Sequence, residues 1–95
     1  MIQGKTKTGF SYEIAEDTMN NMELVDAMAE LDEGGHPFAL SRVCILLLGK
    51  AQRKRLYDHI RDEDGKVPPQ KMGEEIADII RGYGEQGKNS APSPE

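Results

Sequence analysis

The sequence contains no tryptophan, and only two phenylalanines and three tyrosines among its 95 residues. With so few aromatic rings, the core has to be built from Leu, Ile, Met and the two Phe side chains. Cysteine is nearly absent as well. Cys44 is the only one, so the chain cannot form an internal disulfide, and a reducing cytosol suits it. Because Cys44 lies inside an apolar run, we expect a buried, unreactive thiol.

The sequence also lacks a long apolar run, a signal peptide and an excess of positive charge. A membrane span takes about 20 apolar residues, and the longest apolar stretch, 38–48, is much shorter. The residues after Met1 are mostly polar, unlike a signal peptide. The net charge of −5 disfavours a general role in binding nucleic acid or anionic membranes. We therefore expect a soluble protein that binds neither.

The length predicts one small domain over 1–86, followed by a disordered tail over 87–95 that is rich in Ser, Pro and Asn. Residues 2–14 are typical of a β-hairpin, because Phe10, Tyr12 and Ile14 alternate with polar residues and Thr8-Gly9 suits a turn. Two strands are marginally stable alone, so we expect this hairpin to pack on helices. An alternative is that its free edge accepts a strand from a partner.

The rest of the domain, 21–83, predicts four short helices, so the fold class is mainly α with an N-terminal β-hairpin. The predicted helices are 21–32, 37–48, 50–61 and 69–83, with Pro37 starting the second and Gly49 ending it. Three of them have one apolar face each. The second is apolar almost all the way round, interrupted only by Ser41 and Arg42. We therefore expect the other helices to pack around it, with the hairpin as a lid.

The residue patterns favour no catalytic site, cofactor or metal. The acidic turn Asp62–Gly65 lacks calcium-loop spacing, because the first and twelfth loop positions would fall on residues that cannot ligate. His36 and His59 are isolated, whereas a metal site needs three or four ligands. Ser41 and Cys44 have no nearby acid–base partner. We therefore expect that the protein is not an enzyme.

A group of basic residues around the predicted third helix raises the alternative of a helix-turn-helix DNA binder. The net charge is negative, and this helix offers a single Gln and no Asn, Ser or Thr to read bases. A solvated helix face is the better interpretation of these residues: Lys50, Arg53, Lys54, Arg55 and Arg61.

The segments Gly9–Ile14, Met22–Leu31, Leu46–Gly49 and Arg61–Pro68 follow one another along the chain. In this order they resemble the small tail assembly chaperones of long-tailed (siphovirus-type) phages and prophages of Gram-positive bacteria. The hairpin contributes Gly-Phe-Ser-Tyr-Glu-Ile over 9–14, and the chain ends in Lys-Asn-Ser-Ala-Pro-Ser-Pro-Glu. The resemblance covers about residues 5 to 95. It is most specific in three segments: Met22–Leu31, Leu46–Gly49 and Arg61–Pro68.

The resemblance implies a protein that is made in the host cytoplasm and is absent from the mature virion. Members of this family bind the long helical tape measure protein, keep it soluble and help to recruit tail tube subunits. In many phages a ribosomal frameshift appends a second domain, and residues 84–95 would suit a linker to it.

A chaperone for a helical client needs exposed apolar surface, and flexible methionines suit this use. We expect the core and a client groove to share apolar residues of the first, second and fourth helices. The candidate partner-binding residues are Met22, Val25, Met28, Phe38, Leu40, Ile45, Leu48, Met72, Ile76 and Ile80. The alternative from a different class is a small homodimeric phage adaptor or regulator, which would bury the second helix against its copy.

Overall fold

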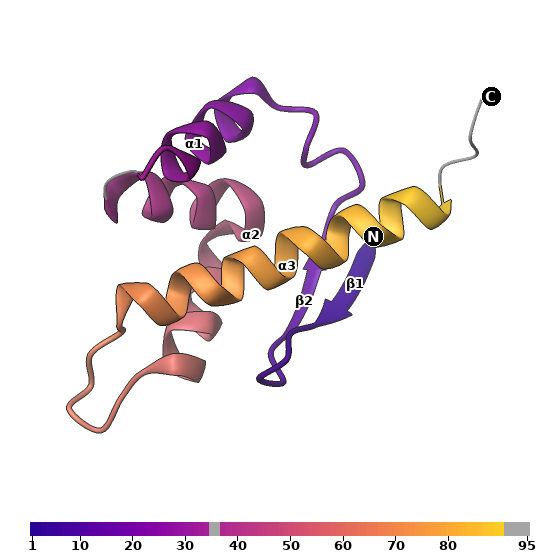
Figure 1. The fold of residues 1–95 in the computed structure, drawn as a ribbon. Coiled ribbons are helices and arrows are strands. Elements are labelled where there is room, and N and C mark those ends of the chain that lie inside the picture. The colour runs from indigo at the N-terminus through magenta and orange to yellow at the C-terminus, as the bar shows by residue number, and fades with distance from the viewer. Residues whose placement is uncertain (35–36, 91–95) are drawn as a thin grey trace.

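The computed structural model describes residues 1–34 and 37–90, with side chains described for all of these except Pro37 and residues 85–90. Within them lie two strands, β1 (Ile2–Lys5) and β2 (Ser11–Ile14), and three helices, α1 (Met22–Asp32), α2 (Pro37–Ile60) and α3 (Pro69–Ser90) (Figure 1). The mainly α class with an N-terminal hairpin is confirmed. The predicted number of four helices is wrong by one.

The helix count differs because the second and third predicted helices form one bent element, α2. Gly49 interrupts it with φ 79° and ψ 170°, a conformation that glycine adopts at little cost. The helix resumes directly after this residue, without a loop. α2 therefore has two arms, 37–48 and 50–60, that run in different directions (Figure 1).

α3 is longer than predicted. It continues to Ser90 instead of ending near Tyr83, because Gly82 and Gly84 keep a helical backbone and do not take the positive φ of a helix stop. The predicted start of the tail at residue 87 is corrected accordingly, since 87–90 are helical. Residues 91–95 of the predicted tail lie outside the described part of the chain, as do Gly35 and His36.

The hairpin forms as the alternating pattern predicts. Ile2 pairs with Ile14. Two backbone hydrogen bonds close the three-residue loop 7–9: the Thr6 N–H donates to the Phe10 carbonyl, and the Gly9 N–H donates to the Thr6 carbonyl. Gly9, at φ 98°, supplies the left-handed residue that such a loop requires. The inward side chains of both strands, and that of Phe10 directly before β2, are buried in the core: Ile2, Phe10, Tyr12 and Ile14.

The outer edge of β2 is capped by side chains of α2. The Gln52 amide accepts a hydrogen bond from the Glu13 N–H and donates one to the Glu13 carbonyl, both at 2.7 Å. Arg55 donates to the Ser11 carbonyl at 3.3 Å. These side chains satisfy the groups that a partner's strand would use. Strand addition at this edge is therefore disfavoured.

The first arm of α2 is the centre of the core, as its apolar sequence predicts. α1 and α3 both pack on α2, and the hairpin packs on α2 and α3. Together they bury most of the first arm: Ala39, Leu40, Val43, Cys44, Leu47 and Leu48. The side that stays open carries Phe38, which is 79% exposed, and the partly buried Ile45. None of the described helices has both the length and the apolar content needed to cross a bilayer.

Candidate functional site: an apolar groove between two helices

α1 exposes part of its apolar surface. Asn21 caps its start, since the side-chain oxygen accepts a hydrogen bond from the Glu23 N–H at 3.0 Å. Leu24 is fully buried against the core, whereas Met22 and Val25 are 67% and 44% exposed. The apolar arc of this helix is therefore wider than the strip that α2 covers.

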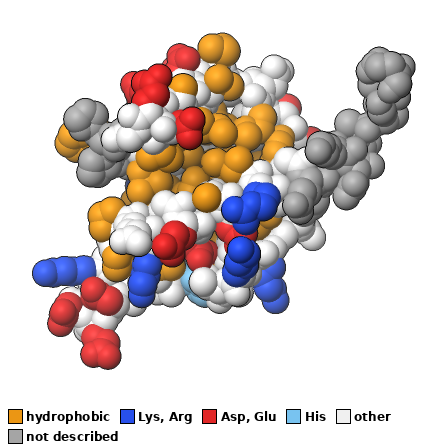
Figure 2. Space-filling model, viewed as in Figure 1, with side chains coloured by type: hydrophobic (Ala, Val, Ile, Leu, Met, Phe, Trp, Pro, Cys, Tyr) orange, Lys and Arg blue, Asp and Glu red, His pale blue; other side chains and the backbone are white. Residues whose placement is uncertain are grey.

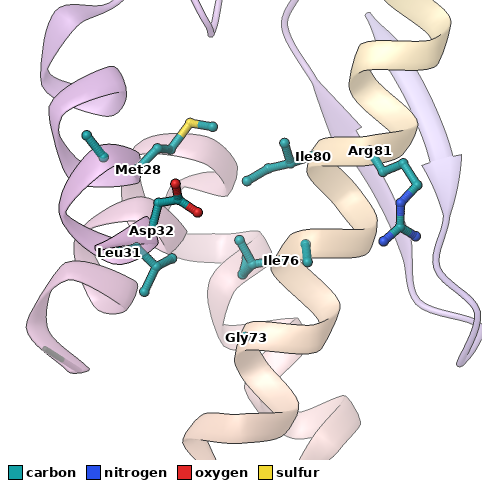
Figure 3. A pocket seen from close by; sticks show the side chains of 9 residues that line it. Met28, Leu31, Asp32, Gly73, Ile76, Ile80 and Arg81 are labelled. Atoms are coloured by element: carbon teal, nitrogen blue, oxygen red, sulfur yellow. The ribbon is translucent and has the colours of Figure 1, made fainter. Parts of the chain in front are cut away.

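An open groove of about 650 Å³ lies beside this arc, between α1 and α3 (Figure 3). In the space-filling view, a continuous hydrophobic area occupies the middle of the same face (Figure 2). Both helices that form the walls pack on α2, so the groove follows from the way α2 holds them apart. The lining residues are Met28, Ala29, Leu31 and Asp32 of α1, and Gly73, Ile76, Ala77, Ile80 and Arg81 of α3.

The groove walls contain several small residues. Gly73 has open space where a side chain would begin, and Ala29 and Ala77 add only a methyl group each. Small side chains at a helix contact let two helix axes approach to about 8 Å. Long apolar side chains such as Met28 and Ile80 lie beside these small residues. The shape is that of a channel able to receive a third helix.

The structure brings three candidate residues together in this groove: Met28, Ile76 and Ile80. Val25 precedes Ala29 by four residues and Met22 precedes it by seven, so both extend the same side of α1 beyond the groove. Met22, Val25, Met28 and Ile80 form one apolar surface that spans two helices, and Ile76, which is only 1% exposed, lies beneath it in the floor of the groove.

The remaining candidates lie elsewhere. Leu48 and Met72 are only 5% and 4% exposed, so in this conformation they pack the helices together and lie outside the groove between α1 and α3. Leu40, 9% exposed, lines a second cavity of about 260 Å³ together with Met72. Phe38 and Ile45 lie on the open side of α2, outside the groove lining.

Sequence reasoning did not select the small groove residues Ala29, Gly73 and Ala77, nor the charged Asp32 and Arg81. The available signal was helical spacing, because Ala77 and Arg81 follow Gly73 at intervals of four residues. Selecting only large apolar residues hides such positions, since a groove is defined as much by the side chains that are short.

Cys44 is buried, as predicted. Burial raises the pKa of its thiol to about 11, and the charge of Arg53 offsets only part of this effect. The thiol is therefore protonated at neutral pH and a weak nucleophile.

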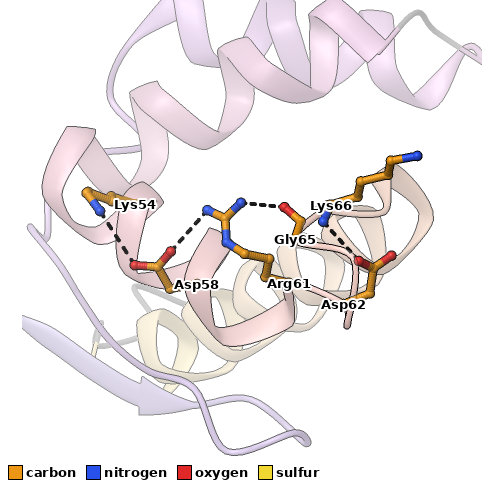
Figure 4. A network of polar contacts seen from close by, with 6 residues as sticks. All are labelled: Lys54, Asp58, Arg61, Asp62, Gly65 and Lys66. Carbon is orange, nitrogen blue, oxygen red and sulfur yellow. Dashed lines mark hydrogen bonds and ion pairs between the residues drawn. The ribbon is translucent and has the colours of Figure 1, made fainter.

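Two of the basic residues near the end of α2, Lys54 and Arg61, are paired within the chain (Figure 4). Asp58 lies 3.6 Å from Lys54 and 3.0 Å from Arg61, which also donates to the Gly65 carbonyl at 2.7 Å. The hydrogen bond from Arg61, followed by the charge of Lys54, lowers the pKa of Asp58. Asp62 accepts hydrogen bonds from the backbone of the acidic turn. These contacts tie the end of α2 to the turn that follows it.

A second polar cluster fastens the hairpin loop to the helices. The Thr8 hydroxyl donates to Glu75 Oε2 at 2.7 Å and lies 2.9 Å from His59 Nε2. Glu75 is 5% exposed, and its Oε1 has no hydrogen-bond partner among the described residues. The His59 ring also lies against the Phe10 ring, with 5.7 Å between the ring centroids. A search of the described part of the chain finds no group of three metal-ligating side chains.

Comparisons of the chain with protein-family models, with curated proteins and with solved structures gave no match. The function is therefore inferred from the groove and from the resemblance in the sequence.

Proposed function

We propose that this protein is a tail assembly chaperone of a long-tailed phage or prophage. In this role it binds the helical tape measure protein in the host cytoplasm and helps to recruit tail tube subunits, and it does not remain in the virion. It acts by binding alone, without enzymatic activity. The observation that carries the proposal is the open apolar groove between α1 and α3.

The groove supports this role because an amphipathic helix can lay its apolar face into such a channel. A tape measure protein is long and helical, and its apolar stripe is prone to aggregation before the tail tube surrounds it. Covering part of that stripe would keep the client soluble. Met22 and Met28 add flexible side chains that adapt to different client segments.

The size of the groove suits reversible binding. Two short helix faces supply the contact, so the interface stays in the range below about 1,200 Å² that is typical of transient complexes. A chaperone has to leave when tube subunits arrive, and a small interface favours such exchange. A client with several equivalent stripes would bind several copies.

Co-expression with the tape measure protein encoded beside this gene tests the proposal. We expect the soluble fraction of the tape measure protein to rise and the two proteins to purify together. An unrelated acidic helical protein of similar size serves as the control. If the tape measure protein stays insoluble and does not co-purify, the proposed function is wrong.

A further inference from the structure

We infer that the helix received by the groove carries Lys or Arg side chains along the edge that faces α1. The inference rests on the proposed function, because it specifies the chemistry of the partner for the same groove. Apolar contact would hold the helix in place, and charge would decide which helices bind and in which orientation.

The first observation is the charge of α1. Its eleven residues, Met22–Asp32, contain four carboxylates and no Lys or Arg. The carboxylates belong to Glu23, Asp26, Glu30 and Asp32. The space-filling view shows acidic side chains gathered over α1 along one border of the hydrophobic area (Figure 2). Asp32 lines the groove, and the other three carboxylates lie on the exposed outer face of α1, so the α1 side of the groove has a negative border.

The second observation is which carboxylates remain available. Glu30 is paired with Arg42 at 3.3 Å. Asp26 and Asp32 are exposed and have no ion-pair partner in the described part of the chain. Asp32 lines the groove itself, as Figure 3 shows. Asp26 precedes the groove residue Ala29 by three positions, which places it about 60° around α1 from Ala29, on the outer border of the groove.

The opposite wall is balanced in charge. Arg81 lines the groove from α3 and pairs with Asp78 at 3.2 Å, and Asp78 also accepts a hydrogen bond from the Lys7 N–H at 2.7 Å. Positive partner side chains would therefore be attracted to the α1 wall and not to the α3 wall. This asymmetry gives a basic-edged helix one preferred placement in the groove.

A second copy of this chain is a poorer occupant. Two-fold pairing through the groove would bring two copies of α1 into one interface. Each copy would contribute unpaired carboxylates at Asp26 and Asp32, and like charges in an interface oppose association. The charge pattern favours a basic partner over self-association.

Three designed peptides test the inference. All share one Leu/Ala stripe on an 18-residue helix, and they carry Lys, Gln or Glu along one edge. Fluorescence anisotropy measures their affinity for the full-length protein. Exposed ion pairs are worth about two- to fivefold in affinity each, so the Lys peptide should bind about tenfold more tightly than the Glu peptide. High salt should reduce this difference.

A charge reversal on the α1 side of the groove, Asp26→Lys with Asp32→Lys, should invert the order of the peptide affinities, so that the Glu peptide binds most tightly. The matched control, Glu63→Lys with Asp64→Lys, makes the same change in net charge on the turn between α2 and α3, and it should leave the order unchanged. Circular dichroism checks that both variants keep their helix content.

Several results would overturn the inference. They are equal binding of the three peptides, no binding of any, or inversion of the order by the control variant. A dimer that dissociates when peptide binds would identify a second copy as the occupant and overturn it too. These outcomes are independent of co-expression. Ordered peptide binding without co-purification of the tape measure protein would instead refute the proposed function.

Discussion

Tyr12 shows how single residues set the distance between the hairpin and α3. Its hydroxyl lies between Gly4 of β1 and Gly82 of α3. A Cβ added at Gly82 would lie 2.5 Å from the hydroxyl oxygen and 3.8 Å from ring carbon Cζ. Glycine within a helix costs about 1 kcal/mol relative to alanine. At Gly82 the helix accepts this loss, because only glycine leaves room for the Tyr12 hydroxyl against α3.

Gly82→Ala should therefore lower the free energy of unfolding by about 1–2 kcal/mol, because overpacking exceeds the gain in helix propensity. Adding Tyr12→Phe should recover part of this loss, since Cζ then meets the new methyl at an ordinary distance. Gly84→Ala is the matched control. Nothing lies within 4 Å of its Cβ position, and it should stabilise by about 0.5–1 kcal/mol. Urea unfolding measures all of them, and equal stabilisation by the two alanines would contradict this packing.

At the scale of elements, the second arm of α2 is held to the following turn by charge. Asp58 joins Lys54, one turn earlier, to Arg61, which reaches the Gly65 carbonyl (Figure 4). Exposed ion pairs contribute little individually. Here the Asp58 carboxylate pairs with both Lys54 and Arg61, and the Arg61 guanidinium also closes the turn. The stabilisation is therefore local to the end of the helix.

The lowered pKa of Asp58 predicts a pH dependence. Because the folded-state pKa lies below the ordinary value of 3.8, the carboxylate stabilises the fold above that value. This contribution disappears as the pH falls through the folded-state pKa. Asp58→Asn should therefore have a lower melting temperature than the wild type at neutral pH, and the gap should close as the pH falls below 3.8 and the carboxylate takes up its proton. A gap that stays constant across this range would exclude the ionic origin.

The sequence predicts elements with a strong local pattern. Period-2 alternation ending at Ile14 predicts the hairpin, the apolar face of residues 21–32 predicts α1, and Gly49 marks a backbone break. Helix continuation is harder to predict. The helix resumes directly after Gly49, and α3 passes through Gly82 and Gly84, because a glycine ends a helix only when it takes positive φ.

The groove illustrates the same limit for the candidate site. Helical periodicity indicates that Met28, Ile76 and Ile80 lie on apolar faces. It does not show that α1 and α3 stand apart on α2, because that separation arises from the bend and from the packing of the hairpin against α3. Buried Met72 and open Ile80 have the same pattern in the sequence. Only their tertiary neighbours distinguish them.

At the scale of the whole molecule, α2 acts as a scaffold that carries two helices without closing the space between them. The hairpin fixes α3 from one side, through buried Tyr12 and through the Thr8–Glu75 hydrogen bond of 2.7 Å. α1 contacts the core through a narrower strip that includes Leu24. The apolar surface left between them is the feature from which the proposed chaperone function derives.

Co-purification of the tape measure protein with groove variants tests this claim most directly. Ala77→Trp places a large side chain in the groove from an exposed position, so the fold should be retained. Lys71→Trp adds the same side chain at an exposed position two residues from Gly73, about 200° around α3. We predict that Ala77→Trp reduces recovery of the tape measure protein by about tenfold or more, while Lys71→Trp leaves it unchanged. Full recovery with Ala77→Trp would show that the client binds elsewhere.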